Sequence, residues 1–335
     1  MPDMKAVESK NRKRIVVLGG GTGTFTVLSG LKYHPVDLSA VVSIADDGGS
    51  TGILRDELGV LPPGDIRQCL VALASGDQVL RDLFNYRFNQ GGLDGHNFGN
   101  IFLSALEKIT GDSLAAVREA NRILNVRGRV IPVSARAADL YAELEDSTVV
   151  KGEHAIDKPE GNRAAIRKCF LSPEVPANPE ALDAIRQADI VVMGPGDLYT
   201  SLIPVLLVKG LAQALAQSRA KRLLVINLTS KSGQTQGYKA SDFCGVVSRH
   251  IAPASIDAVL MNAVKPTDDI VQRYTEAGDH LIEDDLDENA VRVWRGELLS
   301  DDLAQAVPGD RLKRSLLRHD PDKLAAAILA SAGII

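Results

Sequence analysis

Residues 19–24, GGGTGT, combine residue types that bind phosphate: Gly19, Gly20, Gly21, Thr22, Gly23 and Thr24. Glycine N–H groups can approach an anion closely, and the first turn of a following helix adds about half a positive charge. The spacing is not the dinucleotide fingerprint G-x-G-x-x-G, because Thr24 or Thr26 stands at its last position, and no Gly-Lys-Ser/Thr of a P-loop follows. The loop therefore predicts a phosphate site without naming the compound, and a tight strand-to-helix turn is the alternative.

Three aspartates are candidates for metal binding or catalysis. Asp46 and Asp47 are adjacent and directly follow the apolar run 38–45, and Asp65 stands in PPGDIRQ. Carboxylates at a strand end suit Mg²⁺, which prefers oxygen ligands and is often shared with a phosphate. One of them could instead accept a hydrogen bond from a ribose or activate a hydroxyl. The structural alternatives are an Asp-Gly turn at 46–48 and a helix N-cap at Asp65.

Further polar residues fall near the same predicted strand ends and helix starts. Arg67 has the chemistry of a phosphate or carboxylate clamp, and His96 is a candidate acid, base or ligand contact, or else a structural hydrogen-bonding residue. The loop at 193–201, MGPGDLYTS, repeats the first loop's combination of glycines and hydroxyls after an apolar strand. The remaining candidates for nucleotide or phosphate binding are Gly48, Ser50, Asn97, Asn100, Gly194, Gly196, Asp197, Ser201 and Asn227.

The elements that must position these residues alternate between strand and helix. Apolar strands are predicted at 14–19, 38–45, 188–194, 222–228 and 256–262, and helices at 24–34, 179–188, 201–217, 242–249 and 322–330. Such near-continuous apolar strands are typical of a parallel sheet covered on both faces. We therefore predict an α/β fold with a Rossmann-like, doubly wound, mainly parallel sheet. Its ligand would bind beyond the carboxyl ends of the strands.

The middle of the chain departs from this alternation. Helices are predicted at 66–75, 80–88, 98–109 and 114–124 without an intervening strand, which indicates a helical insertion or capping subdomain around 66–125. The strands at 128–134, 140–147 and 148–154 alternate polar and apolar residues, which predicts a small β hairpin region around 128–172 that turns at 145–147. We expect a flexible N-terminus at 1–13 and one Rossmann-like domain at 14–335.

Composition limits the class of protein. The net charge of −5 argues against general nucleic-acid binding, which depends on a basic surface. The three cysteines lie far apart, which is typical of idle thiols in a reducing compartment. The apolar runs are short or interrupted, for example by Lys209, so we expect neither a signal peptide nor a membrane span. These features favour a cytoplasmic protein.

Six blocks of sequence, in order, resemble a known family. GGGTGTFTVLSGL, ADDGGSTGILRDELG, PPGDIRQCLVALA, GHNFGNIFL, LNVRGRVIPVS and GPGDLYTSLIPVLL resemble the gluconeogenesis-factor (YvcK-like) branch of the family that includes 2-phospho-L-lactate transferase (CofD-like). The resemblance implies a Rossmann-like cytoplasmic protein that binds a UDP-sugar such as UDP-N-acetylglucosamine. It also implies a role in growth on gluconeogenic carbon sources, cell shape and cell-wall precursor supply.

The resemblance also carries residue roles and leaves alternatives open. By analogy with the transferase branch, Asp46 or Asp47, together with Asp65, would hold Mg²⁺, and the loops at 20–24 and 194–201 would hold nucleotide and phosphate. Tyr274 in VQRYTE and Arg318 in LRHDP fall in blocks similar to the UDP-sugar-binding tail of the gluconeogenesis-factor branch. The first hypothesis is a UDP-sugar-binding regulator, with a homo-oligomer and regulatory protein partners as further expectations. A Mg²⁺-dependent phosphotransferase and an NAD-binding protein are the alternatives.

Overall fold

The computed structural model describes residues 12–76, 78–159, 161, 163–301 and 316–334. Its main sheet has the strand order β10-β9-β8-β7-β1-β2-β3, and every neighbouring pair in it is parallel. The strands are β1 (Lys13–Gly19), β2 (Val36–Val42), β3 (Arg129–Pro132), β7 (Ile190–Met193), β8 (Lys221–Val225), β9 (Ala258–Asn262) and β10 (Arg292–Gly296).

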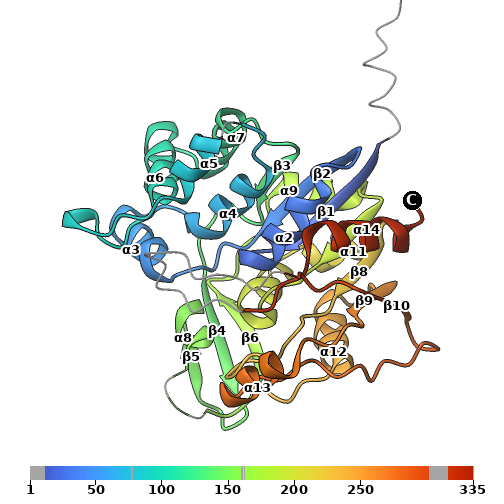
Figure 1. The fold of residues 1–335 in the computed structure, drawn as a ribbon. Helices are drawn as coiled ribbons and strands as arrows, with labels where there is room; N and C mark the ends of the chain where they lie inside the picture. Colours follow the sequence, from blue (N-terminus) through green and yellow to red (C-terminus); the bar gives the residue numbers. More distant parts are fainter. Residues whose placement is uncertain (1–11, 77, 160, 162, 302–315, 335) are drawn as a thin grey trace, which may run out of the picture.

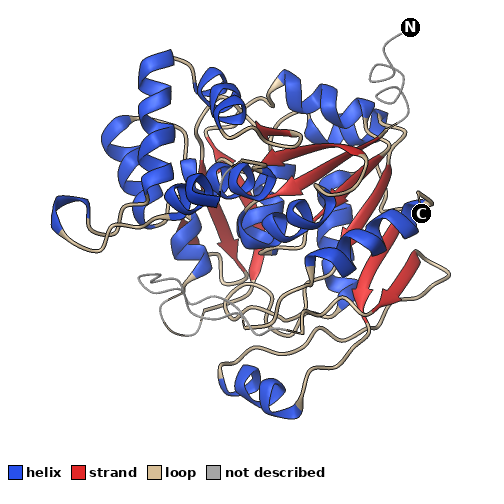
Figure 2. Ribbon diagram, turned by 45° about the horizontal axis from the view of Figure 1, so that its top comes forward, coloured by secondary structure: helices blue, strands red, loops and turns tan. Residues whose placement is uncertain are grey.

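Helices cover both faces of this sheet, as Figures 1 and 2 show. The helices of the described residues are α2 (Gly21–Leu31), α3 (Gly49–Leu58), α4 (Pro63–Leu73), α5 (Gln78–Asn85), α6 (Phe98–Thr110), α7 (Ser113–Ile123), α8 (Glu153–Asp157), α9 (Pro179–Gln187), α10 (Ile203–Leu206), α11 (Leu211–Gln217), α12 (Ala240–Ile251), α13 (Asp268–Glu276) and α14 (Pro321–Ala332). Two short turns of other helix types are η2 (Gly91–Leu93) and η3 (Leu198–Leu202).

The strand order is doubly wound around β1. The chain proceeds from β1 to β2 and β3 on one side, then returns and adds β7 to β10 on the other side. The predicted Rossmann-like, mainly parallel architecture is therefore confirmed. Because β1 and β7 are neighbours whose following segments leave in opposite directions, the point between them is the topological switch point, where such sheets bind their ligands.

Alternation along β1 divides the core into two layers. Ile15 and Val17 belong to a core cluster with residues of α2, α4 and α14, and Val16 and Leu18 belong to a cluster with residues of α9, α11 and α12. Successive side chains of a strand point to opposite faces, so an apolar run of this kind requires cover on both sides. These buried residues fix the position of the strand ends that carry the candidate site.

The predicted hairpin region is correct in its second half and wrong in its first. β4 (Asp139–Leu144) and β5 (Val149–Lys151) pair antiparallel across the expected turn, and β6 (Ile166–Ser172) adds a third strand on the other side of β4. β3, however, pairs parallel with β2 and forms the edge of the main sheet. Val130 and Ile131 are each 2% exposed, so the short run needs cover on both faces, which a two-stranded hairpin does not give.

Several helices differ from the sequence prediction. The helix expected at 201–217 is broken into η3, α10 and α11, and Gly210 adopts a φ of +98° just before α11. The helices α3, α8 and α13 and the strand β10 were not predicted. α3 begins in a glycine-rich stretch, GGSTG, which is typical of a loop.

Two predictions depend partly on residues that are not described. Of the N-terminal segment at 1–13, residues 1–11 lie outside the described residues, and Lys13 already begins β1. Across the described part of the chain, no helix combines the length and the apolarity that crossing a membrane requires.

Candidate functional site

The two glycine loops that follow β1 and β7 lie against each other. A Cβ built on Gly23 would stand 2.2 Å from the carbonyl oxygen of Pro195, and one built on Gly196 would stand 3.6 Å from the carbonyl oxygen of Gly20. A Cβ on Gly21 would stand 3.7 Å from the hydroxyl oxygen of Ser201. Loops some 170 residues apart in sequence therefore share one place at the switch point, where Gly23 permits direct main-chain contact.

Asn227, at the end of the next strand, fixes the second loop. Its side-chain amide donates to the Gly196 carbonyl at 2.9 Å, and its Oδ1 accepts from the Gly196 N–H at 3.4 Å. Gly194 and Gly196 have φ values of +71° and +143°, which side chains other than glycine rarely adopt. Asp197 and Ser201 follow in the same loop, and Asp197 leads directly into η3.

The first glycine loop holds a carboxylate from within the protein. The Oδ1 atom of Asp65 accepts from the Gly21 N–H at 2.9 Å, and a Cβ on Gly20 would lie 2.0 Å from the Asp65 Oδ2 atom. Asp65 is thus not the N-cap of α4, whose N-cap position is Pro62. Burial, followed by the charge of Asp46, raises the pKa of Asp65 to about 7. The amino end of α2 therefore binds an anionic group, and the group present is Asp65.

Asp46 lies beside Asp65 and acts on its charge. Asp46 accepts from the Gly48 N–H at 3.0 Å, and its Oδ2 would contact a Cβ on Gly64, the residue before Asp65. Burial raises the pKa of Asp46 as well. Asp47 points elsewhere, because its carboxylate accepts from the His154 N–H at 2.8 Å at the start of α8. The structure thus brings Asp46 and Asp65 together and gives Asp47 a helix-capping contact.

These residues fit one type of metal site. Among the described residues, no group of three or more histidines, cysteines, aspartates or glutamates is arranged to hold a metal ion. Mg²⁺, however, usually takes only one or two carboxylates and completes its shell with waters and ligand phosphates. Asp46 and Asp65 fit that pattern, and a bound cation would reduce the repulsion between the two carboxylates and a phosphate.

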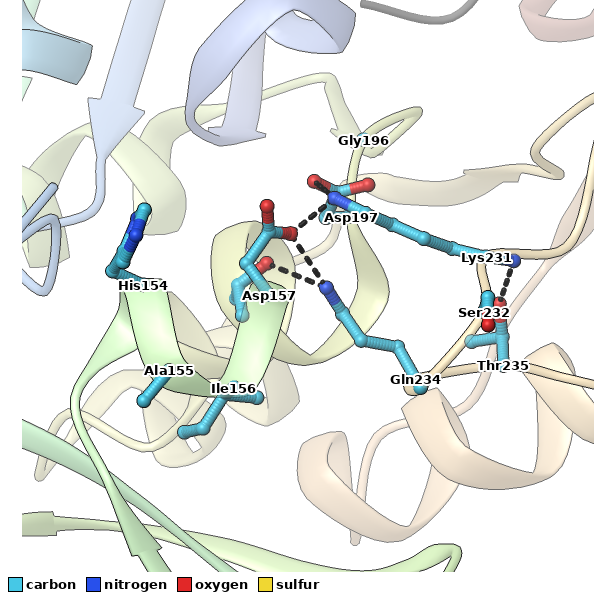
Figure 3. A network of polar contacts seen from close by, with 12 residues as sticks. His154, Ala155, Ile156, Asp157, Gly196, Asp197, Lys231, Ser232, Gln234 and Thr235 are labelled. Carbon is cyan, nitrogen blue, oxygen red and sulfur yellow. Dashed lines mark hydrogen bonds and ion pairs between the residues drawn. The ribbon is translucent and has the colours of Figure 1, made fainter. Parts of the chain in front are cut away.

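A lysine and two further carboxylates lie beside the second glycine loop (Figure 3). Lys231 donates to Asp197 at 2.6 Å and also to Asp157 of α8, and Gln234 donates to Asp157 at 2.8 Å. Burial opposes the charge of Lys231, but Asp197 and Asp157 outweigh it and raise the lysine's pKa. The Oε1 atom of Gln234 is buried and has no hydrogen-bond partner among the described residues.

Glu153, in the first turn of α8, completes a group of carboxylates. Burial raises its pKa to about 10, and the charges of Asp46, Asp157, Asp65 and Asp47 add to the effect. The sequence analysis missed Glu153, Asp157 and Lys231. Glu153 and Asp157 fall in the region expected to be a hairpin, without a glycine motif. Lys231 follows Asn227 by four residues, and its position soon after the end of β8 is the one sequence feature that could have marked it as a site residue.

The remaining candidates of the helical segment form an internal network. Arg67 is 7% exposed and donates to the Asn100 Oδ1 atom at 3.0 Å and to the Asn85 Oδ1 atom at 2.9 Å. The hydroxyl of Ser50 accepts from the N–H of Asn97 and contacts the Nδ1 atom of His96, each at 3.2 Å. These contacts tie α3, α4, α5 and α6 together. The charge of Arg67 still acts on the site, because it offsets part of the rise in the pKa of both Asp65 and Asp46 that burial causes.

Three other predicted residues occupy separate positions. The buried Thr24 hydroxyl has no hydrogen-bond partner in the described part of the chain, and it lies beside Gly19. Tyr274 is 8% exposed, and its hydroxyl accepts from the Leu317 N–H at 2.8 Å, which places Arg318 next to the same contact. Leu228, the neighbour of Asn227, packs against the small cluster that contains Tyr274 and Leu317.

Comparison with known proteins identifies the family. The family model described as 2-phospho-L-lactate transferase CofD matches residues 15–299. The chain belongs to the CofD family. It is 39% identical over 321 residues to the gluconeogenesis factor of Bacillus subtilis, covering 95% of this chain and 98% of that protein. A putative gluconeogenesis factor of Nostoc is 44% identical over 318 residues, covering 94% of this chain and 68% of that protein.

A solved structure supports the same assignment. A crystal structure of a member of the UPF0052 family from Bacillus halodurans superposes with a TM-score of 0.87 at 38% sequence identity, covering 95% of this chain and 99% of that one. The predicted membership of the gluconeogenesis-factor branch of the CofD family is thereby confirmed. The assignment covers both glycine loops and the carboxylate group, since all of them lie within residues 15–299.

Proposed function

We propose that the chain binds a nucleotide sugar of the UDP-N-acetylglucosamine type between the loops at 19–24 and 194–201. In this proposal it is a cytoplasmic regulator that links gluconeogenic carbon metabolism to cell-wall synthesis and cell shape. The observation that carries the proposal is the contact between the two glycine loops at the β1–β7 switch point. Membership of a family whose relatives are named gluconeogenesis factors supports the metabolic role.

The chemistry of the loops suits a diphosphate joined to sugars. Backbone N–H groups at the amino end of α2 are hydrogen-bond donors for phosphate oxygens. The carboxylates Asp157 and Asp197 can accept hydrogen bonds from ribose or sugar hydroxyls, and Lys231 between them offsets part of their negative charge. A diphosphate that binds the Gly21 N–H must displace the Asp65 carboxylate from it, because Asp65 already uses that donor. A cation shared by Asp65 and the phosphate would then reduce the repulsion between them.

Isothermal titration with UDP-N-acetylglucosamine, with and without Mg²⁺, tests the proposal. We expect measurable binding that Mg²⁺ strengthens, since the cation would offset repulsion between phosphate and the pair Asp46–Asp65. The variant Asn227→Ala, which removes both contacts to Gly196, should weaken binding about tenfold or more. Asn289→Ala, in an exposed loop, is the matched control. The absence of heat at millimolar ligand would contradict the proposal.

The proximity of Asp46 and Asp65 favours a second function, a Mg²⁺-dependent phosphotransferase of the 2-phospho-L-lactate transferase type. Two neighbouring carboxylates beside a glycine loop are the residues that such chemistry needs to hold a metal–phosphate unit. Incubation with nucleotide-linked donors and acceptors in the presence of Mg²⁺ should then release free nucleotide. Asp65→Asn should abolish release, whereas Asp56→Asn, on the exposed side of α3, should not. If no nucleotide is released with a broad panel of donors and acceptors, the phosphotransferase proposal is contradicted and only the regulator proposal remains.

A further inference from the structure

A large cavity lies at the amino ends of the strands of the main sheet, whereas the glycine loops lie at their carboxyl ends. It has a volume of about 730 Å³ and is formed by the amino ends of β1 and β2, the residues that precede β3, and the carboxyl ends of α2 and α9. This volume is within the range of small-molecule sites, ~300–1,000 Å³. None of the residues singled out in the sequence lines it, and the proposed function does not use it.

The wall of this cavity is strongly basic. Its charged residues are Arg12, Arg14, Lys32, Arg127, Arg129 and a single acid, Asp37. Within the described part of the chain, none of these five cations takes part in an ion pair; the nearby Asp189 pairs with Lys13 instead. Concentrated positive charge without acidic partners is unfavourable to the folded protein, and a bound anion would relieve it.

The cations are held in place by neutral partners. Arg14 donates to the carbonyl and side-chain oxygens of Gln187, at 3.4 and 3.3 Å, and Arg129 donates to the Ser39 hydroxyl at 3.3 Å. Lys32 donates to the Ala72 carbonyl at 2.7 Å. Because each partner is neutral, the guanidinium and ammonium charges remain available to a ligand. A guanidinium also has donors beyond those used here.

An exposed tyrosine lies between two of the cations. Tyr33 is 67% exposed, the Lys32 Nζ atom stands 5.3 Å from its ring centroid, and the Arg127 guanidinium carbon stands 5.9 Å from it. These cation–π contacts orient Arg127 and Lys32 toward the same side of the cavity. Burial, and then the charges of Arg81 and Arg127, lower the pKa of Lys32.

From this geometry we infer that the cavity at the amino edge of the sheet is a second ligand site, for a small phosphorylated molecule with at least two negative charges. Arg127 and Arg129 are the principal phosphate ligands, because both flank the same short segment and are exposed. Arginine is suited to this role, since its planar fork binds two phosphate oxygens at once. This site is separate from the switch point, and it does not rest on the proposed nucleotide-sugar binding.

Isothermal titration with inorganic pyrophosphate at low salt tests the inference on the full chain. We expect binding that weakens about tenfold or more in the double variant Arg127→Ala/Arg129→Ala, which loses two charge-assisted contacts. The control, Arg118→Ala/Lys265→Ala, removes the same charge from positions outside the cavity and should bind as the wild type does. Raising the ionic strength should weaken the same binding.

The glycine loops could also bind pyrophosphate, so the two sites must be told apart. The Arg127→Ala/Arg129→Ala variant should keep its affinity for UDP-N-acetylglucosamine, and Asn227→Ala should keep the arginine-dependent pyrophosphate binding. If the proposed function fails, the arginine-dependent binding remains. The inference is overturned if pyrophosphate does not bind, if the arginine variant binds it like the wild type, or if the control variant loses binding equally.

Discussion

At the scale of single residues, the most informative group is the Asp65 carboxylate, held by the Gly21 N–H and close to Asp46. Its pKa of about 7 in the folded protein lies above its ordinary value of 3.8. A raised carboxylate pKa means that the folded state binds the proton more tightly than the unfolded state. The group therefore costs stability as the pH rises from about 4 to about 7, and the cost is constant at higher pH.

Asp65→Asn should remove this cost. Relative to wild type, the variant should gain about 1 kcal/mol of unfolding free energy for each pH unit between 4 and 7, and no more above 7. Urea unfolding at pH 5, 6, 7 and 8 measures it. Glu153→Gln is a useful contrast, because a pKa of about 10 predicts a gain that continues beyond pH 7. A pH-independent difference for Asp65→Asn would contradict the assignment.

Lys231 is the second residue whose role can be measured. Lys231→Met would leave Asp157 and Asp197 as unpaired carboxylates, so we expect a loss of about 1–3 kcal/mol, discounted because the lysine side chain is 33% exposed. The double variant Lys231→Met/Asp157→Asn should recover part of this loss. Urea unfolding of the four proteins in the cycle gives the coupling. Additive losses would show that the two residues act independently.

At the scale of elements, the contact between the two glycine loops depends on one missing side chain. In Gly23→Ala the new Cβ would meet the Pro195 carbonyl oxygen at 2.2 Å and its carbon at 2.4 Å, and neither main-chain atom can swing aside. We expect a destabilisation of about 1–3 kcal/mol and weaker nucleotide-sugar binding. Gly92→Ala, where a Cβ has no neighbour within 4 Å, should change stability by less than about 0.5 kcal/mol.

Thermal unfolding of both glycine variants, together with titration of UDP-N-acetylglucosamine, separates a local clash from a general effect of alanine. Equal behaviour of Gly23→Ala and Gly92→Ala would show that the loops can move apart without cost. Such a result would remove the main geometric support for a shared ligand position.

The elements also show what the sequence could and could not predict. The strands β1, β2, β7, β8 and β9 were predictable, because near-continuous apolar runs have few alternatives to a buried parallel sheet. β3 was placed in the wrong sheet, because a run of four residues carries no information about its partner strand. Long-range pairing, such as Val41 with Ile131, is decided by packing and not by local sequence.

The residues of the candidate site also fall into those that the sequence could predict and those that it could not. Glycine motifs marked both loops that meet at the switch point, because glycine is required where main chains touch. Glu153, Asp157 and Lys231 carried no motif, and only the fold of the 139–172 segment brings α8 to the strand ends. The network around Arg67 shows the opposite case, in which residues close in sequence to a motif serve the packing of helices.

At the scale of the whole molecule, the C-terminal segment closes one face of the sheet. His319 is 7% exposed, forms an antiparallel bridge with Leu299, and precedes α14, whose apolar residues pack on the core. Burial lowers the pKa of His319 to about 4. The unfolded chain takes up a proton near pH 6.5, so folding stability should fall as the pH drops from about 6.5 to about 4, by about 1 kcal/mol per pH unit.

His319→Gln should reduce this acid sensitivity, because the variant has no group at position 319 that titrates in this range. Unfolding free energies at pH 4.5, 5.5, 6.5 and 7.5 test it, with His280→Gln, at an exposed position, as the control. If wild type and His319→Gln lose stability in parallel below pH 6.5, the buried imidazole does not account for the loss.

The parallel arrangement of the main sheet has a last consequence for long-range electrostatics. Because all strands of the main sheet run the same way, the arginines lie at their amino ends and the carboxylate group lies at their carboxyl ends. The molecule therefore carries a separation of charge along the strand direction, which grows as the pH rises and the carboxyls of raised pKa lose their protons. A protein with such poles turns as it approaches a charged surface. An anionic surface would meet the arginine end first and leave the glycine loops facing the solvent. Added salt would weaken that preference, because it screens charges that are separated by more than the Debye length of about 8–10 Å.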